Sequence, residues 1–455
     1  MKKNKIGKEL YSWAKILFPL NRSLTGGGVR DTLSFFKKKI PKLSLKKIRS
    51  GTKVFDWKIP KEWKIDEAYI EDQEKRRIVD FNKNNLHVMG YSAPINKFIS
   101  FSELDSHLYS LPAQPKAIPY RTSYYKKNWG FCLAHKKRKL LDKKKKYKVV
   151  IKSKFFNGRL NYGELLLKGK SKKEILLSCN ICHPSLASNE LSGPIVTAAI
   201  ARWLEALKKK YSYRILFIPE TIGSIAYLSK NYKKMKKLTI AGFVITCVGD
   251  NKKYSYLSSR SGSTLADEAA KLAFKRNNIK FKKYSYLSRG SDERQYCSPG
   301  IDLPVCSIMR SKYGTYPEYH TSLDNLSFIS SEGLQGSFNL IKKIIEIIEM
   351  GTILKKYKCN NFQKNKKNLK NIKKNKKLLI STKLCEPFMS KYNLRSTIGG
   401  GKLNHDSKLF SDLLAFSDGK KNLHELSRII KTDYLNTCKI SKKLIKLKLL
   451  KTAKL

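Results

Sequence analysis

Apolar runs alternate with amphipathic helical segments over residues 151–350, and this pattern constrains the fold more than any other feature of the chain. The run 174–182, EILLSCNIC, is apolar over most of its length, which is typical of a strand buried on both faces of a sheet. Further strands are expected at 213–219 and 240–248, and helices from Pro194, at 261–278 and at 332–350. The alternation predicts an α/β fold, with a mixed, mainly parallel sheet flanked by helices.

The segments outside this alternation differ from it in composition. Residues 1–50 predict a helix, a glycine-rich turn at 26–28 and a second helix. Residues 51–150 hold short aromatic and β-branched runs interrupted by prolines, which indicates a compact β-rich domain. Residues 355–378 are rich in Lys and Asn, so we expect a solvated linker there. Residues 379–455 predict short helices and a final strand, the order of a small winged-helix domain.

The chain is strongly basic, with 95 Lys and Arg against 35 Asp and Glu and a formal net charge of +60. Such a field suits nucleic acid or an anionic membrane surface. The lysines occur in every segment, however, and arginine, which base-reading proteins favour for its bidentate fork, is comparatively sparse. We therefore interpret the charge mainly as a lysine-rich composition, with nucleic-acid binding as the alternative.

Targeting and redox signals point to the cytoplasm. The first 28 residues are basic, but Lys15 interrupts their apolar part, which favours an amphipathic helix over a signal peptide. No apolar run approaches the roughly 18 residues that a membrane helix needs. Nine cysteines at irregular spacing indicate reduced thiols rather than a disulfide framework.

Polar side chains follow three of the expected strands at the point where each strand ends. These are His183, Glu220 and Asp250. Two polar clusters come later in the chain, GSDERQY at 290–296 and YPEYHTSLDN at 316–325. Ligands of open α/β sheets gather at the carboxyl ends of the strands. Imidazoles and carboxylates there are the donors that a hydrolytic zinc site uses, together with a carboxylate that takes a proton from water.

Each of these residues also has an ordinary structural interpretation. His183 taken alone is more typical of a structural histidine than of a ligand. Asp292, within SDER, and Glu220, before the helix that follows it, are both placed to cap a helix. The zinc hypothesis depends on the whole constellation rather than on any single member.

The stretch CNICH, residues 179–183, allows a second interpretation as a C-x-x-C-H haem-attachment motif. Haem attachment requires an exported chain, and Cys179 falls inside an expected buried strand. A zinc ribbon is disfavoured because the chain has no second C-x-x-C pair. We therefore expect this stretch to deliver His183 to a metal-type pocket.

Several long segments resemble a bacterial aminopeptidase-like family whose members are often described beside polysaccharide-biosynthesis genes. The family is distantly similar to the zinc-dependent bacterial leucyl aminopeptidases. The resemblance implies a discontinuous zinc exopeptidase-like domain at 1–50 and 151–354, an inserted β-rich domain at 51–150 and a winged helix at 379–455. The segments that carry it are LFPLNRSLTGGGVRDTL, ICHPSLASNELSGPIVTAAIARWL, IPETIGSIAYLS, VITCVGD and the 37 residues from Gly290 to Leu326.

Carried over by position, the resemblance implies a metal site with a degenerate ligand set. Asn189 stands where the zinc aminopeptidases have an aspartate that bridges two ions, and Thr221 stands where they have a ligand glutamate. The number of zinc ions, one or two, therefore stays open. The implied metal ligands are His183, Asn189, Asp250, Asp292 and His320; Glu220 is the implied general base, and Glu293, Arg294 and Tyr319 are candidates for substrate contact.

We expect a zinc-dependent aminopeptidase-like hydrolase of a peptide or amide bond, on a small or sugar-linked substrate. The alternative is a catalytically lapsed peptidase scaffold that serves as a binding or regulatory protein, with the winged helix contacting nucleic acid or protein. The tail carries lysines but few arginines, which indicates weak, non-specific nucleic-acid contact at best. Its lysines are Lys431, Lys439, Lys442, Lys443 and Lys446.

Overall fold

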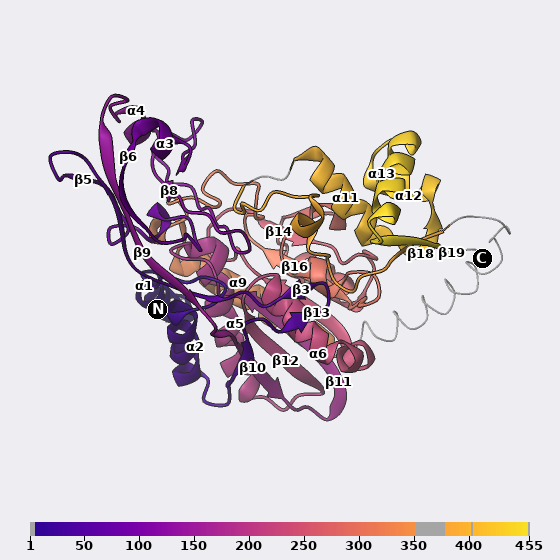
Figure 1. Ribbon diagram of the computed structural model, residues 1–455. Coiled ribbons are helices and arrows are strands. Elements are labelled where there is room, and N and C mark those ends of the chain that lie inside the picture. Colours follow the sequence, from indigo (N-terminus) through magenta and orange to yellow (C-terminus); the bar gives the residue numbers. More distant parts are fainter. Residues whose placement is uncertain (1–4, 352–377, 402–403, 454–455) are drawn as a thin grey trace.

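An eight-stranded sheet organises the largest part of the molecule (Figure 1). The computed structural model describes residues 5–351, 378–401 and 404–453. The strand order is β1-β10-β12-β11-β13-β16-β14-β15, and four of the seven neighbouring pairs are parallel. The expected mixed, mainly parallel sheet is thus confirmed. In sheet order the strands are β1 Ser44–Arg49, β10 Arg159–Leu167, β12 Tyr211–Ile218, β11 Ser171–Asn180, β13 Thr239–Ile245, β16 Val305–Met309, β14 Tyr254–Leu257 and β15 Phe281–Tyr284.

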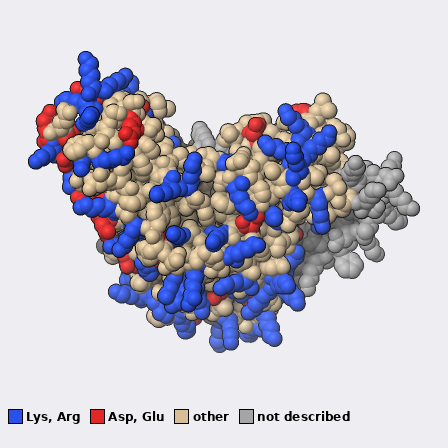
Figure 2. Space-filling view, in the orientation of Figure 1, with Lys and Arg blue, Asp and Glu red and all other residues tan. Residues whose placement is uncertain are grey.

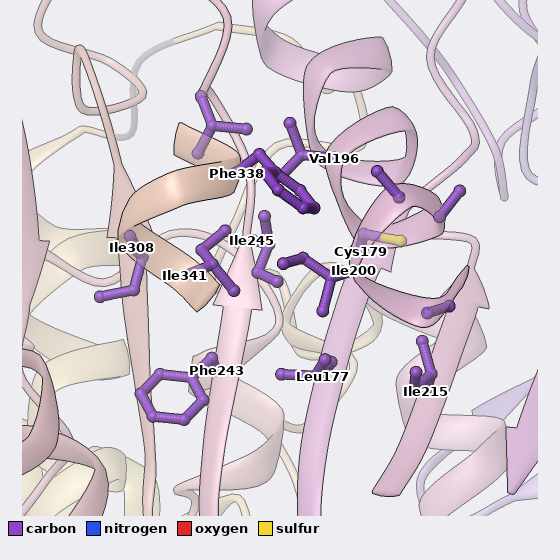
Figure 3. Packing of buried hydrophobic residues seen from close by; sticks show 14 of the residues in the cluster. Leu177, Cys179, Val196, Ile200, Ile215, Phe243, Ile245, Ile308, Phe338 and Ile341 are labelled. Atoms are coloured by element: carbon purple, nitrogen blue, oxygen red, sulfur yellow. The ribbon is translucent and has the colours of Figure 1, made fainter. Parts of the chain in front are cut away.

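Helices cover both faces of this sheet, because alternate residues of the buried strands point to opposite sides. Leu177, Phe243 and Ile308 face a cluster built from α1, α2, α5, α7 and α9 (Figure 3). Leu176 and Val244 face a second cluster, which includes α6, α8 and the C-terminal domain. The bounds are α1 Lys5–Leu17, α2 Gly27–Lys39, α5 Ser192–Glu205, α7 Leu265–Arg276, α9 Ser331–Glu349, α6 Ile222–Leu238 and α8 Glu293–Tyr296. Each large side chain that is fully buried contributes about 1.5–3 kcal/mol.

A separate antiparallel sheet, in the order β5-β4-β9-β6, forms the β-rich region. It has its own hydrophobic cluster, in which Ile70, Val149 and Ile151 are buried. Strand β9 crosses the boundary expected between residues 150 and 151, because its pairing with β4 continues to Phe156. The strands are β4 Glu62–Glu71, β5 Arg77–Asp80, β6 Ile95–Ser100 and β9 Lys146–Phe156; the shorter elements are β2 Lys53–Val54, β3 Trp57–Lys58, α3 Phe101–Asp105, β7 Leu108–Tyr109, β8 Phe131–Cys132 and α4 His135–Lys139.

The C-terminal region contains the expected helices and final strand, and it adds two strands that pair with it in the order β18-β17-β19. Asn422 caps α12 through a capping box with Glu425, and Asp433 caps α13. The linker expected at 355–378 lies outside the described residues except for Leu378. The elements are β17 Leu378–Ser381, α11 His405–Phe416, β18 Asp418–Asn422, α12 Leu423–Ile430, α13 Tyr434–Lys446 and β19 Leu450–Ala453.

The two smaller regions rise from opposite sides of the α/β domain, and the surface between them is hollowed (Figures 1 and 2). Isolated β-bridges join Pro119 to Thr321 and Thr122 to Gly399. The loop at 119–122 therefore contacts both the α/β domain and the segment that leads into α11. The visible face of Figure 2 shows Lys and Arg side chains spread over all three regions rather than gathered in one patch.

Among the described helices, none has both the length and the apolar character needed to cross a membrane.

Candidate functional site

His183 lies in the loop after β11, and a buried carboxylate fixes its ring. Its Nδ1 is 2.7 Å from Oε2 of Glu190, and Oε1 of Glu190 accepts the backbone N–H groups of His183, at 2.8 Å, and Cys182. Because a carboxylate only accepts, Nδ1 carries a proton and Nε2 is left to face the pocket. Burial lowers the pKa of His183, but the charge of Glu190 outweighs burial and raises the pKa overall.

His320 brings a second imidazole to the same place. The centroids of the His183 and His320 rings are 5.3 Å apart, and the Tyr120 ring lies 5.0 and 5.1 Å from the two. His320 has a left-handed φ of 55° and stacks on Tyr319 at 3.9 Å. Its Nε2 is buried and has no hydrogen-bond partner among the described residues. Burial and the nearby His183 hold the pKa of His320 well below its usual value, so the ring is a neutral donor for a cation.

Glu220 follows β12 and points to this pair of rings. Its Oε2 lies 3.9 Å from Nε2 of His183. Its Oε1 accepts hydrogen bonds from Ser291 Oγ at 2.7 Å and Asn180 Nδ2 at 3.1 Å. Burial raises the pKa of Glu220, which suits a group that takes and returns a proton near neutral pH.

The turn after Glu220 is strained and is held by Asp292. Thr221 has a φ of 64°, which is rare for a β-branched residue and costs of order 1–3 kcal/mol. Oδ1 of Asp292 accepts the Thr221 N–H at 2.7 Å and the Ser224 hydroxyl at 2.8 Å, at the start of α6. Burial and the charge of Glu220 raise the pKa of Asp292 to about 8. Its Oδ2 is buried without a partner among the described residues.

Asn189 lies in the π-helical turn Ala187–Leu191, which Asp324 anchors. The carboxylate of Asp324 accepts the N–H groups of Ser188 at 2.6 Å and Asn189 at 2.9 Å, while burial raises the pKa of Asp324 to about 7. The Asn189 side chain donates to Cys247 Sγ at 3.7 Å. Its Oδ1 is buried without a hydrogen-bond partner in the described part of the chain.

Asp250 and Glu293 are engaged in holding loops. The carboxylate of Asp250 accepts the N–H and hydroxyl of Ser311, each at 3.1 Å, and the Lys252 N–H at 2.8 Å. Glu293 is fully buried and accepts the Gly290 and Ser291 N–H groups and the hydroxyls of Tyr313 and Ser307. Glu293 therefore orients the turn from which Ser291 reaches Glu220.

Arg294 links this turn to the C-terminal region. Its Nη2 donates to Thr221 Oγ1, and its Nη1 pairs with Glu386 at 3.0 Å. Arg395 also donates to Glu386, at 2.8 Å. Burial opposes the effect, but Arg294 and Arg395 together lower the pKa of Glu386 to about 2. Tyr319 is half-buried and stacks against His320.

Sequence reasoning did not assign a role to Glu190, Asn180, Ser291 or Glu386. Glu190 had a signal, because it is the one carboxylate in the span SNELSG. Its donor atoms and those of Cys182 and His183 lie within 4.8 Å of one another. Glu190 and Cys182 hold the loop that carries His183. The Glu190 oxygens accept three hydrogen bonds, and Cys182 Sγ accepts the Glu220 N–H at 3.2 Å.

Two imidazoles lie close together near the carboxyl ends of the strands, and imidazole nitrogen is a ligand that zinc prefers. The two ring centroids are 5.3 Å apart, Glu190 sets the tautomer of His183, and Nε2 of His320 is buried without a partner among the described residues. Glu220 lies beside them, with Oε2 3.9 Å from Nε2 of His183. The positions that would complete a second ion are an amide, Asn189, and a hydroxyl, Thr221, which Arg294 already contacts.

Comparisons with known proteins agree with this architecture. A family profile described as a domain of unknown function (DUF4910) matches residues 11–351, and a winged helix-turn-helix profile matches 377–452. A relative from Clostridium acetobutylicum, described as a candidate polysaccharide biosynthesis protein with an aminopeptidase-like domain, is 40% identical over 423 residues, covering 92% of this chain and 91% of the relative. The expected winged helix and the aminopeptidase-like resemblance are confirmed.

Solved structures extend the comparison to fold. A crystal structure of a candidate peptidase from Clostridium acetobutylicum has a TM-score of 0.74 at 37% identity, covering 99% of this chain and 97% of that one. A zinc aminopeptidase from Bacillus subtilis has a TM-score of 0.56 at 15% identity, covering 74% of this chain and 94% of that one. The second likeness is one of fold, and it agrees with the expected zinc exopeptidase-like architecture.

Proposed function

This chain belongs to the DUF4910 family, and from that premise we propose that it is a zinc-dependent, aminopeptidase-like hydrolase of a peptide or amide bond. The observation that supports the proposal most is the convergence of His183 and His320, with Nδ1 of His183 fixed by Glu190 and Nε2 of His320 left without a partner. We propose that these two Nε2 atoms hold one ion, with Asn189 Oδ1 as a further oxygen donor. Asp250 and Asp292 then serve as anchors of their loops, since their oxygens accept backbone and hydroxyl hydrogen bonds.

Zinc held by these residues would supply Lewis acidity for the scissile carbonyl. Glu220 acts as the general base: it takes a proton from the attacking water and returns that proton to the leaving amine. Ser291 and Asn180 hold Oε1 of Glu220, which leaves Oε2 directed at the pocket. Proton transfer by a positioned carboxylate contributes about 10²–10⁴ in rate.

The remaining candidates divide into two roles. Tyr319 is half-buried beside His320, so we propose that its side chain contacts substrate. Glu293 and Arg294 are proposed as positioning residues, because their polar atoms hold the turns that carry Ser291 and Thr221. The name of the Clostridium relative supports a sugar-linked amide as the substrate class.

Metal analysis combined with an amidase screen tests the proposal. Purified protein is expected to carry about one zinc per chain and to release amine from short peptides or N-acyl amino sugars. His183→Ala and His320→Ala should lose both zinc and turnover. His424→Ala, at an exposed histidine of α12, is the matched control and should keep both. Absence of zinc from the wild type, together with unchanged turnover in His183→Ala, would overturn the proposal.

A lapsed scaffold with a binding role is the second candidate, and the exposed face of α13 favours it. Lys439, Lys442 and Lys446 lie exposed on this helix with Leu435, which is 79% exposed. Spacings of three and four residues place these side chains on one face. We propose weak, sequence-independent contact with duplex nucleic acid. Binding of the full chain to duplex DNA at about 50 mM salt should weaken steeply as salt is added. The K439E/K442E variant should show a shallower salt dependence, because it releases fewer counterions from the DNA. No binding at that salt would exclude this role.

We propose a cytoplasmic location, which the cysteines support. Eight cysteines in the described part of the chain are free thiols, and seven of them are buried. Free thiols are typical of a reducing compartment.

A further inference from the structure

Arg22 is a buried arginine that the proposed hydrolytic chemistry does not use. It lies in the stretch NRSLTGGG between α1 and α2, and it is 1% exposed. Its Nε donates to the carbonyl oxygen of His183 at 2.9 Å, and its Nη1 donates to that of Leu17 at 2.6 Å. Its Nη2 is buried and has no hydrogen-bond partner among the described residues.

This arrangement differs from that of the other buried arginines. Arg214 is bound by the carboxylates of Glu174 and Glu164, and Arg289 is paired with Asp412 at 2.7 Å. Arg22 forms no ion pair within the part of the chain that the structure describes. A buried cation without a direct counter-charge is costly, and a free N–H group adds to that cost. An anion that binds beside Nη2 would remove both penalties.

A cavity lies beside Arg22, between the α/β domain and the β-rich region. Its enclosed part has room for about one water-sized group, such as one carboxylate oxygen, and the rest is open space at its mouth. Tyr120, Tyr124 and Trp63 are among the residues that line it, and the hydroxyls of the two tyrosines are 2.7 Å apart. Pro184, the residue after His183, also lines it. The cavity therefore opens next to the histidine pair, and the Tyr120 ring separates the two spaces.

The local charge favours a monoanion. Arg22 brings one positive charge, because arginine stays protonated in proteins at neutral pH. Glu190 and Glu220 already place negative charge nearby, which disfavours a dianion such as phosphate. A carboxylate matches both the single positive charge and the planar geometry of a guanidinium edge. The two tyrosine hydroxyls share one hydrogen bond, which leaves one O–H to donate to a carboxylate oxygen.

We propose that this cavity is a binding site for a carboxylate carried by the substrate, with Arg22 Nη2 as the principal donor. The inference deepens the proposed function, because it assigns the substrate an acidic group, such as that of an amino acid or a sugar acid, close to the scissile bond. Arg22 would also couple substrate to the metal pocket, since Nε of the same guanidinium holds the His183 carbonyl.

Acetate is the probe, used on metal-free full-length protein, so that neither metal binding nor turnover enters the measurement. Thermal unfolding is followed as acetate replaces chloride at constant ionic strength, which holds non-specific screening fixed. Acetate at ten times its Kd should raise the unfolding midpoint by about 1–3 °C. Phosphate at the same ionic strength should give a smaller shift. An equal midpoint in acetate and chloride would overturn the proposal, whatever the hydrolase assay shows.

Arg22→Lys tests the role of the guanidinium fork. The lysine keeps the charge but loses the planar edge, so we expect acetate to bind at least tenfold more weakly. Arg214→Lys is the matched control: it also disturbs a buried arginine, but one whose donors are already occupied, and its acetate response should equal that of the wild type.

If Arg22→Lys does not fold, a crystal structure of the wild-type protein grown in acetate tests the proposal instead. We expect an acetate oxygen about 2.8–3.0 Å from Nη2 of Arg22. A full acetate response in Arg22→Lys, or acetate that occupies only other positions in the crystal, would contradict the inference.

Discussion

Arg214 is a buried arginine on the half of β12 nearer its amino end, and it is 2% exposed. Its N–H groups donate hydrogen bonds to Glu174, Glu164 and Tyr227. At the carboxyl ends of β11 and β12 the buried polar groups are not all partnered. His320 Nε2, Asn189 Oδ1 and Asp292 Oδ2 are buried without hydrogen bonds in the described structure. A buried polar group left unpaired costs about 1–3 kcal/mol. The Arg214 cluster thus shows donors that the fold has already occupied, whereas the carboxyl end shows buried polar atoms left available for a ligand.

The largest expected effect is at the carboxyl end, where Glu220→Gln removes the proposed base. Turnover should fall by about 10²–10⁴, because a glutamine cannot take a proton from water. Zinc content should stay near that of the wild type, which separates the base from the ligands. Ser229→Ala, on a surface turn of α6, is the control and should keep full turnover. Unchanged turnover in Glu220→Gln would remove Glu220 from the mechanism.

The next effect is on stability at the amino end. Glu174→Gln leaves Arg214 without its bidentate carboxylate, and breaking a buried pair of this kind costs about 3–5 kcal/mol. The measurement is urea unfolding of metal-free protein. Glu164→Gln should cost less, because the Glu164 side chain is 16% exposed while that of Glu174 is 9% exposed. If Glu174→Gln also lowered zinc affinity, the two ends of the sheet would not be independent.

A smaller effect is expected from Glu190→Gln, which tests how the histidine is prepared. The glutamine replaces a charged hydrogen-bond acceptor at Nδ1 of His183 with a neutral one, so zinc affinity should fall by about 10–100-fold. Competition with a fluorescent chelator measures it. Glu293→Gln, at another fully buried glutamate, is the comparison, and its zinc affinity should change little. Equal losses in the two variants would mean that the effect is general to buried carboxylates.

The sequence predicts the fold better than it predicts the site. Buried strands such as β11 and β13 were predictable, because near-continuous apolar runs have few other places in a globular fold. Helix bounds were less so: α5 begins at Ser192, two residues before the Pro194 from which it was expected, because the π-turn before it continues directly into the helix. Strand β9 runs past residue 150, because its pairing with β4 decides where it ends.

For the site, strand ends indicated where His183 and Glu220 lie, but they did not indicate where each carboxylate points. Asp250 follows β13 as expected, yet its oxygens turn to Ser311, a contact set by the loop after β16. Glu190 and Asn189 are neighbours in sequence, and only the π-turn decides that the acid reaches His183. The sequence does not show which N–H groups of Arg22 already have hydrogen-bond partners, so it could not indicate a role for this residue.

A separate effect is expected on the pH dependence of stability, through Asp292. Its folded pKa, about 8, is raised above the ordinary 3.8, so its contribution is full below pH 4 and is lost as the pH rises toward 8. Asp292→Asn keeps an oxygen for Thr221 and Ser224 but cannot ionise, so the fall in stability between pH 4 and 8 should become shallower. Urea unfolding of metal-free protein across this range measures it. An unchanged pH profile would mean that Asp292 does not titrate there.

One measurement tests the central claim most directly: anomalous diffraction at the zinc edge from crystals of the full-length protein. The account predicts a single ion bonded to Nε2 of both His183 and His320 at about 2.0–2.1 Å, with Nδ1 of His183 still on Glu190. Zinc bound elsewhere, or two imidazoles that remain without an ion at saturating zinc, would contradict it.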